Sequence, residues 1–217
     1  MTPVERIERL VRAGTVTAEE GARLLAAVEP GHARATVWGW LFRPFERIGG
    51  ERAVAIGAGV CAASLLLARS GVHFDGAFDM HPMEPALSLG VAASEQAVSW
   101  ILAALVFWAY ARAVTRHVRV VDFIGFVGVA RAPFVLGAAV WLALVPRNLT
   151  PAWLAEHKLR VTLVAWGLIP FLVWFGLLLY RGFKNASGLA GPKLGVGFAG
   201  VLVIAEAASK LALHLLR

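Results

Sequence analysis

Ionisable side chains interrupt long apolar runs at several places in this sequence. Glu95 lies in one run, Arg131 in the next, and Glu206 and Lys210 in the last. A charge at the centre of a bilayer costs about 2.5–3.5 kcal/mol even on lenient insertion scales. In membrane-spanning helices such side chains therefore face the interior of the bundle or a wet cavity and pair with one another.

The spacing of these residues places them on shared helix faces. Residues 206, 209 and 210 lie on one face of a helix, and residues 95 and 99 lie on one face of another. We interpret them either as contacts between helices, each contributing only about 0.6 kcal/mol, or as a polar route for an ion, a proton or a lipid head group. The predicted intramembrane polar network comprises Glu95, Ser99, Arg131, Glu206, Ser209 and Lys210.

The depth of each residue predicts its partner. At about 1.5 Å per helical residue, Arg131 and Glu206 both fall in the middle third of the hydrocarbon. We therefore predict an Arg131–Glu206 ion pair with a weaker Glu95–Lys210 pair beside it, and Pro133 allows the helix to bend around the contact.

A second group of candidate ligands lies in the stretch "VHFDGAFDMHPMEP". Imidazole and carboxylate groups ligate divalent metals, but their spacing here matches no compact motif, and such groups also simply solvate a loop. The candidate metal ligands are His73, Asp75, Asp79, His81 and Glu84.

The sequence contains no G-x-S-x-G elbow, no P-loop and no G-x-G-x-x-G after a strand. Gly195 and Gly197 lie within a hydrophobic helix, where glycine favours close helix packing. We therefore expect no catalytic residues, no cofactor and no enzymatic activity.

The composition is that of an integral membrane protein. Hydrophobic residues make up 59% of the 217 residues and charged residues only 16%, against roughly 25% charged residues in soluble domains. The net charge of +7 comes from basic residues beside apolar runs, which favours cytoplasmic loops and anionic lipid head groups over nucleic acid. With Cys61 as its single cysteine, the chain forms no intrachain disulfide.

Each apolar run approaches the ~20 residues that cross a bilayer. The runs lie near 53–72, 89–110, 121–145, 161–180 and 194–216. Basic residues follow the second and fourth runs and acidic residues follow the first, so the positive-inside rule predicts a cytoplasmic N-terminus. The loop after the third run, which is also basic, does not fit this pattern.

Two cytoplasmic segments precede the runs. Residues 1–30 carry charges of both signs without the apolar core of a signal peptide. They predict a helical hairpin whose second helix begins with a capping box formed by Thr17 and Glu20. In residues 31–52, tryptophan and phenylalanine alternate with arginine, which predicts an amphipathic helix over 38–52 at the membrane interface.

Four stretches support resemblances to known families. The hairpin "ERIERLVRAGTVTAEEGARLLAAVE" is similar to the SHOCT-like modules of bacterial proteins. "LFRPFERIGGERAVAIGAGV" and "VVDFIGFVGVARAPFVLGAAVW" resemble the entrance and the third span of the Yip domain, and residues 164–204 resemble its last two spans. Eukaryotic Yip proteins bind small GTPases and act in membrane trafficking. The resemblance implies a bacterial relative without that partner, and it carries over no catalytic residues.

We therefore expect an all-α fold: a hairpin over 1–30, an interfacial segment over 31–52 and a five-helix membrane domain over 53–217. The expected protein is a non-enzymatic organiser or adaptor of the bacterial inner membrane. Its hairpin binds a protein partner or a second copy of the chain, and its membrane domain contacts lipids. The alternative is a small transporter, channel or lipid-handling protein that uses the polar face inside the bundle.

Overall fold

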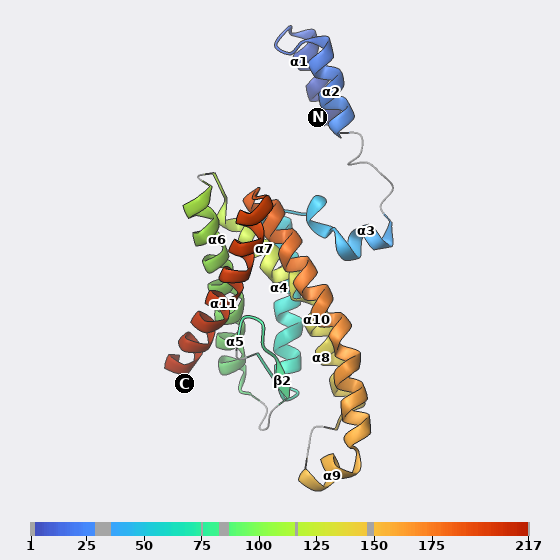
Figure 1. The fold of residues 1–217 in the computed structure, drawn as a ribbon, viewed down its shortest axis with the longest axis vertical. Helices are drawn as coiled ribbons and strands as arrows, with labels where there is room; N and C mark the ends of the chain where they lie inside the picture. The colour runs from blue at the N-terminus through green and yellow to red at the C-terminus, as the bar shows by residue number, and fades with distance from the viewer. Residues whose placement is uncertain are drawn as a thin grey trace. The chain divides into compact units, whose positions relative to one another are not determined.

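The computed structural model describes residues 3–28, 36–74, 76–82, 87–115, 117–146 and 150–216. The chain divides into two compact units, 1–46 and 47–217, which Figure 1 shows as ribbons. The regular secondary structure of the described residues is helical apart from one short antiparallel ladder between β1 (Val72–His73) and β2 (His81–Pro82). The all-α expectation is therefore confirmed in its main feature.

The first unit contains a pair of helices that pack on each other, α1 (Pro3–Arg12) and α2 (Ala18–Val28). The predicted capping box is present. The Thr17 N–H donates to Glu20 Oε2 at 3.0 Å, and the Glu20 N–H donates to Thr17 Oγ1 at 3.2 Å. The hydrogen bonds from Thr17 lower the pKa of the Glu20 carboxyl.

The expectation of one continuous interfacial helix over 38–52 is wrong. Helix α3 (Val37–Phe42) ends at Arg43, and a single 3₁₀ turn, η2 (Pro44–Glu46), follows it. Proline has no N–H to continue the helical ladder and restricts the residue before it, which explains a break at this point. Trp38 and Trp40 are 69% and 47% exposed, as expected of interfacial aromatic residues.

The second unit contains five helical segments that are long and apolar enough to span a membrane. The first span is α4 (Gly50–Ala68). The second span comprises α5 (Leu89–Ala97), η3 (Val98–Leu102) and α6 (Ala103–Val114), and the third comprises α7 (Val120–Ala130) and α8 (Ala132–Leu144). The fourth span is α10 (Lys158–Ser187) and the fifth is α11 (Gly191–Leu216). All five predicted runs are confirmed as helical. A short helix, α9 (Pro151–Glu156), precedes α10.

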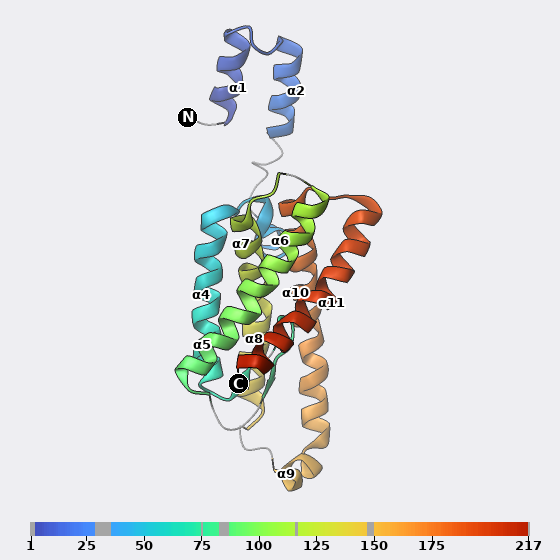
Figure 2. The same cartoon turned by 90° about the vertical axis from the view of Figure 1, so that its left-hand side faces the viewer.

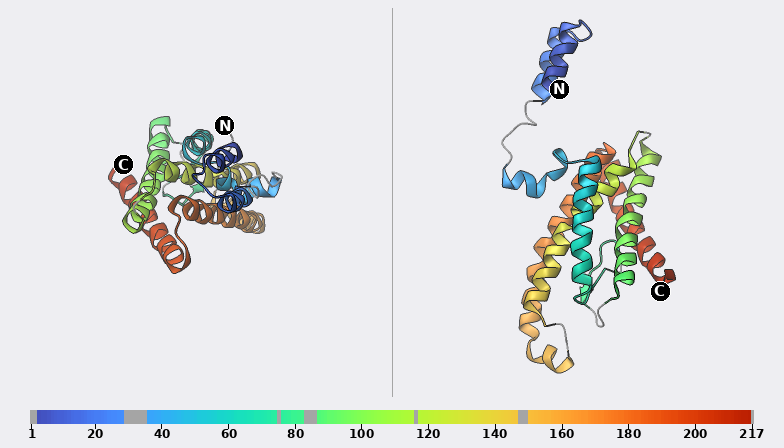
Figure 3. Two further views of the ribbon diagram at one scale, coloured as in Figure 1. Left: turned by 90° about the horizontal axis from the view of Figure 1, so that it is seen from above. Right: turned by 180° about the vertical axis from the view of Figure 1, so that it is seen from behind.

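We call the end of the bundle with residues 47–50, 117–119 and 188–190 proximal, and the end with residues 69–71, 87–88, 145–146 and 150–157 distal. Helices α10 and α11 meet at the proximal end and diverge toward the distal end, as Figure 1 and the right-hand view of Figure 3 show, and Figure 2 shows the same bundle turned by 90°. Helix α10 packs on α7 and α8, whereas α11 packs on α6 and η3.

Helices α4 and α7 pack closely because small residues face each other. A Cβ on Gly128 would lie 2.8 Å from the Gly57 Cα and from the ring of Trp100. The Trp100 indole N–H donates to the Ile124 carbonyl at 2.8 Å, which joins the second span to this contact. Gly197 likewise lies against Tyr110, as predicted for close packing, whereas nothing lies within 4 Å of a Cβ on Gly195.

Two of the spans depart from regular α-helix near their middle. In the second span, η3 is a π-helical segment, a feature frequent at functional sites. In the third span, Arg131 separates α7 from α8, and Pro133 lies in the first turn of α8. Pro133 was expected to allow a bend, and the helix is interrupted two residues before it.

The connection between α4 and α5 folds back into the bundle. We call residues 72–82 the inserted loop; its residue 75 lies outside the described part. Val72, His73, Phe74 and Ala77 are each at most 3% exposed. The expectation of a solvated outer loop is therefore wrong for these residues. Irregular backbone at membrane depth is tolerated where it is buried in protein.

Candidate functional site

The predicted polar residues meet at the inserted loop, where side chains of three spans bind its main chain. Glu95 accepts from the Phe74 N–H at 3.2 Å. Glu206 Oε2 accepts from the Phe78 N–H at 2.9 Å. These carboxylates supply acceptors to amides that have no helical partner, and hydrogen bonds to charged groups contribute about 1.5–3 kcal/mol each.

Helix α11 holds the turn of the inserted loop with Ser209 in addition to Glu206. The Ala77 N–H donates to Ser209 Oγ at 2.8 Å, and Ser209 is fully buried. Gly76 lies directly against the Glu206 carboxylate, in space that a Cβ would need. A Cβ at position 76 would therefore require the Glu206 carboxylate to shift.

Arg131 binds the same loop from the opposite side. Its Nη1 donates to the Ala77 carbonyl at 3.0 Å and to the Ser99 carbonyl at 3.4 Å, and its Nη2 donates to Gln96 Oε1 at 3.4 Å. The guanidinium group is planar with five donors in a fixed fork, so it satisfies several oxygens at once. The acceptor at Ser99 lies within the π-helical segment, so the two interrupted spans are joined here.

The predicted ion pairs are not the ones that form. In the described structure Glu206 Oε1 lies 3.2 Å from Lys210 Nζ, and Arg131 binds the carbonyl oxygens given above. The Glu206 carboxylate still attracts Arg131 electrostatically. Lys210 pairs with Asp79 at 2.8 Å instead of Glu95. Main-chain groups of the inserted loop thus occupy the positions where side-chain partners were expected.

Lys210 and Asp79 form a partly exposed pair at the distal end. Their side chains are 49% and 43% exposed. The hydrogen bond from Lys210 lowers the pKa of the Asp79 carboxyl below its ordinary value of 3.8. Asp79 therefore remains ionised at neutral pH and stabilises the folded state there, and this contribution is lost as the pH falls through the lowered pKa.

The candidate metal ligands do not gather within the described part of the chain. His73 is buried with its Nδ1 3.9 Å from Glu95 Oε1, and its ring stacks on His81 at a centroid distance of 5.9 Å. Among the described residues, no three His, Cys, Asp or Glu side chains are grouped as a metal site would require. Asp75 and Glu84 lie outside the described residues, so the metal site stays a prediction.

Sequence reasoning missed Gln96 and the inserted loop itself. Gln96 is 1% exposed and accepts from Arg131, while its Nε2 has no hydrogen-bond partner among the described residues. Its position next to Glu95, in an otherwise apolar run, was the available signal. The loop had no comparable signal, because its contribution is made by main-chain amides and carbonyls.

The proximal half of the bundle is packed with aromatic side chains, in contrast to the polar network around the inserted loop. Aromatic rings from three other helices, α7, α10 and α11, pack around Phe107 of α6, which is fully buried. Its centroid lies 5.3 Å from that of Phe183, 5.6 Å from that of Phe126 and 6.1 Å from that of Phe198. Phe78 of the inserted loop reaches the same cluster, 6.5 Å from Phe107. The polar network therefore ends against a packed aromatic layer.

The described residues define a class: a helical protein with five candidate membrane spans and a buried loop held by polar side chains of three of them. Comparison of the chain with protein families, with curated proteins and with solved structures finds no match.

Proposed function

We propose that this protein is a non-enzymatic organiser of the bacterial inner membrane, whose N-terminal helix pair binds a protein partner or a second copy on the cytoplasmic side. The resemblances to SHOCT-like modules and to the Yip domain support this proposal. Membrane lipids are its other partners, and nucleic acid is not.

The observation that carries the proposal is the composition and size of the helix pair. It belongs to a compact unit separate from the membrane domain. Ile7 is 9% exposed, and Gly21 packs against Val11, so the two helices do share a contact. Leu24 nevertheless stays 43% exposed. Segments below about 40 residues rarely stabilise themselves by a hydrophobic core alone, so this pair gains stability by docking.

The membrane domain favours an organiser over a transporter. Its intramembrane polar side chains bind the inserted loop, and the aromatic layer around Phe107 fills the proximal half. A transporter, a channel or a lipid-handling protein is the second candidate. Liposomes containing the purified protein separate ion conduction from an organising role, because an organiser moves no ion.

The test of the proposal is crosslinking of the full-length protein in its native membrane. We expect Leu24→Glu to abolish a crosslinked oligomer or heteromer, because the substitution places a charge on the exposed apolar surface. Ala22→Glu is the matched control, since it adds the same charge to the same helix at another exposed position. Deletion of residues 1–30 should reproduce the Leu24→Glu result. Identical crosslinks in the wild type and the deletion would refute docking through the helix pair.

A further inference from the structure

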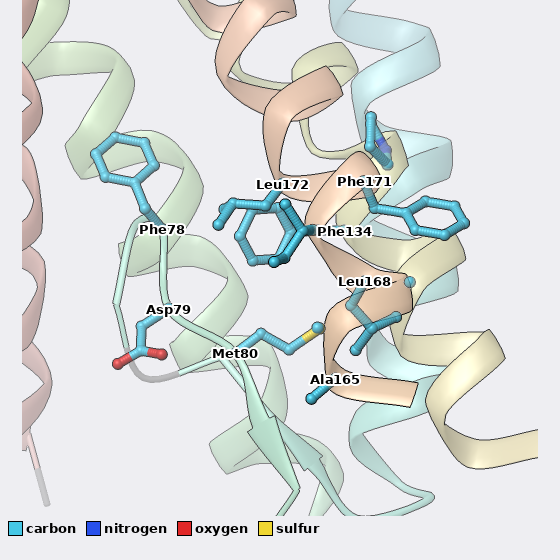
Figure 4. Close-up of a pocket in the computed structure, with 11 residues that line it drawn as sticks. Phe78, Asp79, Met80, Phe134, Ala165, Leu168, Phe171 and Leu172 are labelled. Atoms are coloured by element: carbon cyan, nitrogen blue, oxygen red, sulfur yellow. The ribbon is translucent and has the colours of Figure 1, made fainter. Parts of the chain in front are cut away.

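An apolar groove opens on the side of the bundle between the inserted loop, α8 and α10. Its volume is about 270 Å³. Figure 4 shows Met80 reaching from the loop toward Leu168 and Ala165 of α10, while the Asp79 carboxylate turns away from the groove. Phe134 of α8 forms part of its floor.

The groove is preformed by the contacts that hold its walls. The loop wall is fixed by Glu206, Ser209 and Arg131 through the hydrogen bonds described above. On the α8 wall, a Cβ on Gly137 would lie 3.6 Å from the Phe171 side chain and 3.7 Å from the Leu168 side chain, so a larger side chain at this position competes for the space of the groove. Phe134 packs edge-on against Phe175 at a centroid distance of 4.3 Å, which joins α8 to α10 below the groove.

The surroundings of the groove identify the chemistry of its occupant. Two walls belong to candidate membrane spans, α8 and α10. On α10, Ile169 and Leu172 line the groove and are 42% and 57% exposed, so it opens along the face that a bilayer would cover. The walls are apolar except at Asp79, which lies at one edge. A flexible hydrocarbon chain matches such a lining, as is usual for small-molecule sites.

We propose that this groove binds one acyl chain of a membrane phospholipid, with the head group beyond the edge that Asp79 marks. This site goes beyond the proposed organiser function and does not depend on the helix pair. It gives the inserted loop a second role, because the loop supplies both the apolar wall and the charged edge.

The Asp79–Lys210 pair at the edge of the groove favours a phospholipid over a free fatty acid as the bound lipid. Lys210 is already bonded to two carboxylates, Asp79 at 2.8 Å and Glu206 at 3.2 Å. A fatty-acid carboxylate at this edge would meet ionised Asp79 and gain no unshared cation from Lys210. The head group of a phospholipid is separated from its chain by the glycerol and ester groups, so it reaches past the pair.

The experiment is photolabelling of the full-length protein in phosphatidylethanolamine vesicles that contain a phospholipid with a diazirine on one acyl chain. Peptide mapping should place most label on the groove residues of the loop and α10. We expect Gly137→Leu to reduce this label about tenfold, which corresponds to about 1.4 kcal/mol of binding free energy, because the added side chain fills the groove. Gly167→Leu is the matched control, since nothing lies within 4 Å of a Cβ on Gly167.

Two further measurements make the outcome decisive. If Gly137→Leu does not fold, Ala165→Phe fills the groove from α10 and should give the same loss of label. An excess of unlabelled fatty acid should not displace the label. Label spread evenly over the exposed faces of α10 and α11 and unchanged by either filling variant would overturn the proposal, and displacement by fatty acid would overturn the assignment to phospholipid.

Discussion

Arg131 joins the inserted loop, the second span and the third span through one side chain. Its side chain is buried and donates to a carbonyl of the inserted loop, a carbonyl of the π-helical segment and the Gln96 side chain. Each of these oxygens would be left without that donor if the guanidinium were removed. An unsatisfied buried acceptor costs about 1–3 kcal/mol, so this residue stabilises the distal half as a whole.

At the residue scale we expect Arg131→Met to lower the free energy of unfolding by about 2–4 kcal/mol, because the oxygen atoms that accept from the guanidinium lose this hydrogen-bond donor. Arg131→Lys should recover little of this loss, because an ammonium group lacks the planar fork that reaches several oxygens. Denaturant unfolding in detergent measures both. Lys184→Met, on the exposed part of α10, is the control for loss of one positive charge. Full recovery by lysine would show that the charge alone is required.

At the element scale, the contact between α4 and α7 depends on backbone approach and is open to a direct test. A Cβ on Gly128 would lie 2.8 Å from the Gly57 Cα, so one of the helices must move. We expect Gly128→Ala to destabilise the protein by about 1–3 kcal/mol, the usual effect of overpacking. Gly59→Ala should be neutral or stabilising, because nothing lies within 4 Å of its Cβ and alanine favours helix. Equal effects of the two substitutions on thermal stability would contradict close packing at Gly128.

The helices were largely predictable from the sequence, whereas the inserted loop and the partners of the buried polar side chains were not. Apolar length alone predicted the five spans, because a helix must satisfy its own backbone in lipid. Thr17 and Glu20 predicted the start of α2, because a capping box acts within four residues. The partners of Arg131 and Glu206 were predicted wrongly, because the reasoning paired side chains with side chains. The segment 76–78 contributes main-chain N–H and C=O groups to the network. Every residue type carries these groups, so the sequence alone does not show which segment will supply them.

At the scale of the whole molecule, the two ends of the bundle differ in charge. The described basic residues near the proximal end are Arg47, Arg52, Arg112, Arg119, Arg181, Lys184 and Lys193. The distal end has Asp79 and Glu156 together with a smaller number of basic residues, among them Arg69 and Lys158. The proximal excess corresponds to a cytoplasmic face under the positive-inside rule.

This asymmetry predicts the topology of the protein in a membrane. Five spans place the residues before α4 and those after α11 on opposite sides. We expect a cysteine at position 8 (Glu8→Cys) to react with a membrane-impermeant maleimide only after cell lysis, and His214→Cys to react in intact spheroplasts. Both are made in a Cys61→Ala background, since Cys61 is the single native cysteine. Labelling of position 8 in intact spheroplasts would reverse the orientation and place the helix pair where no cytoplasmic partner can reach it.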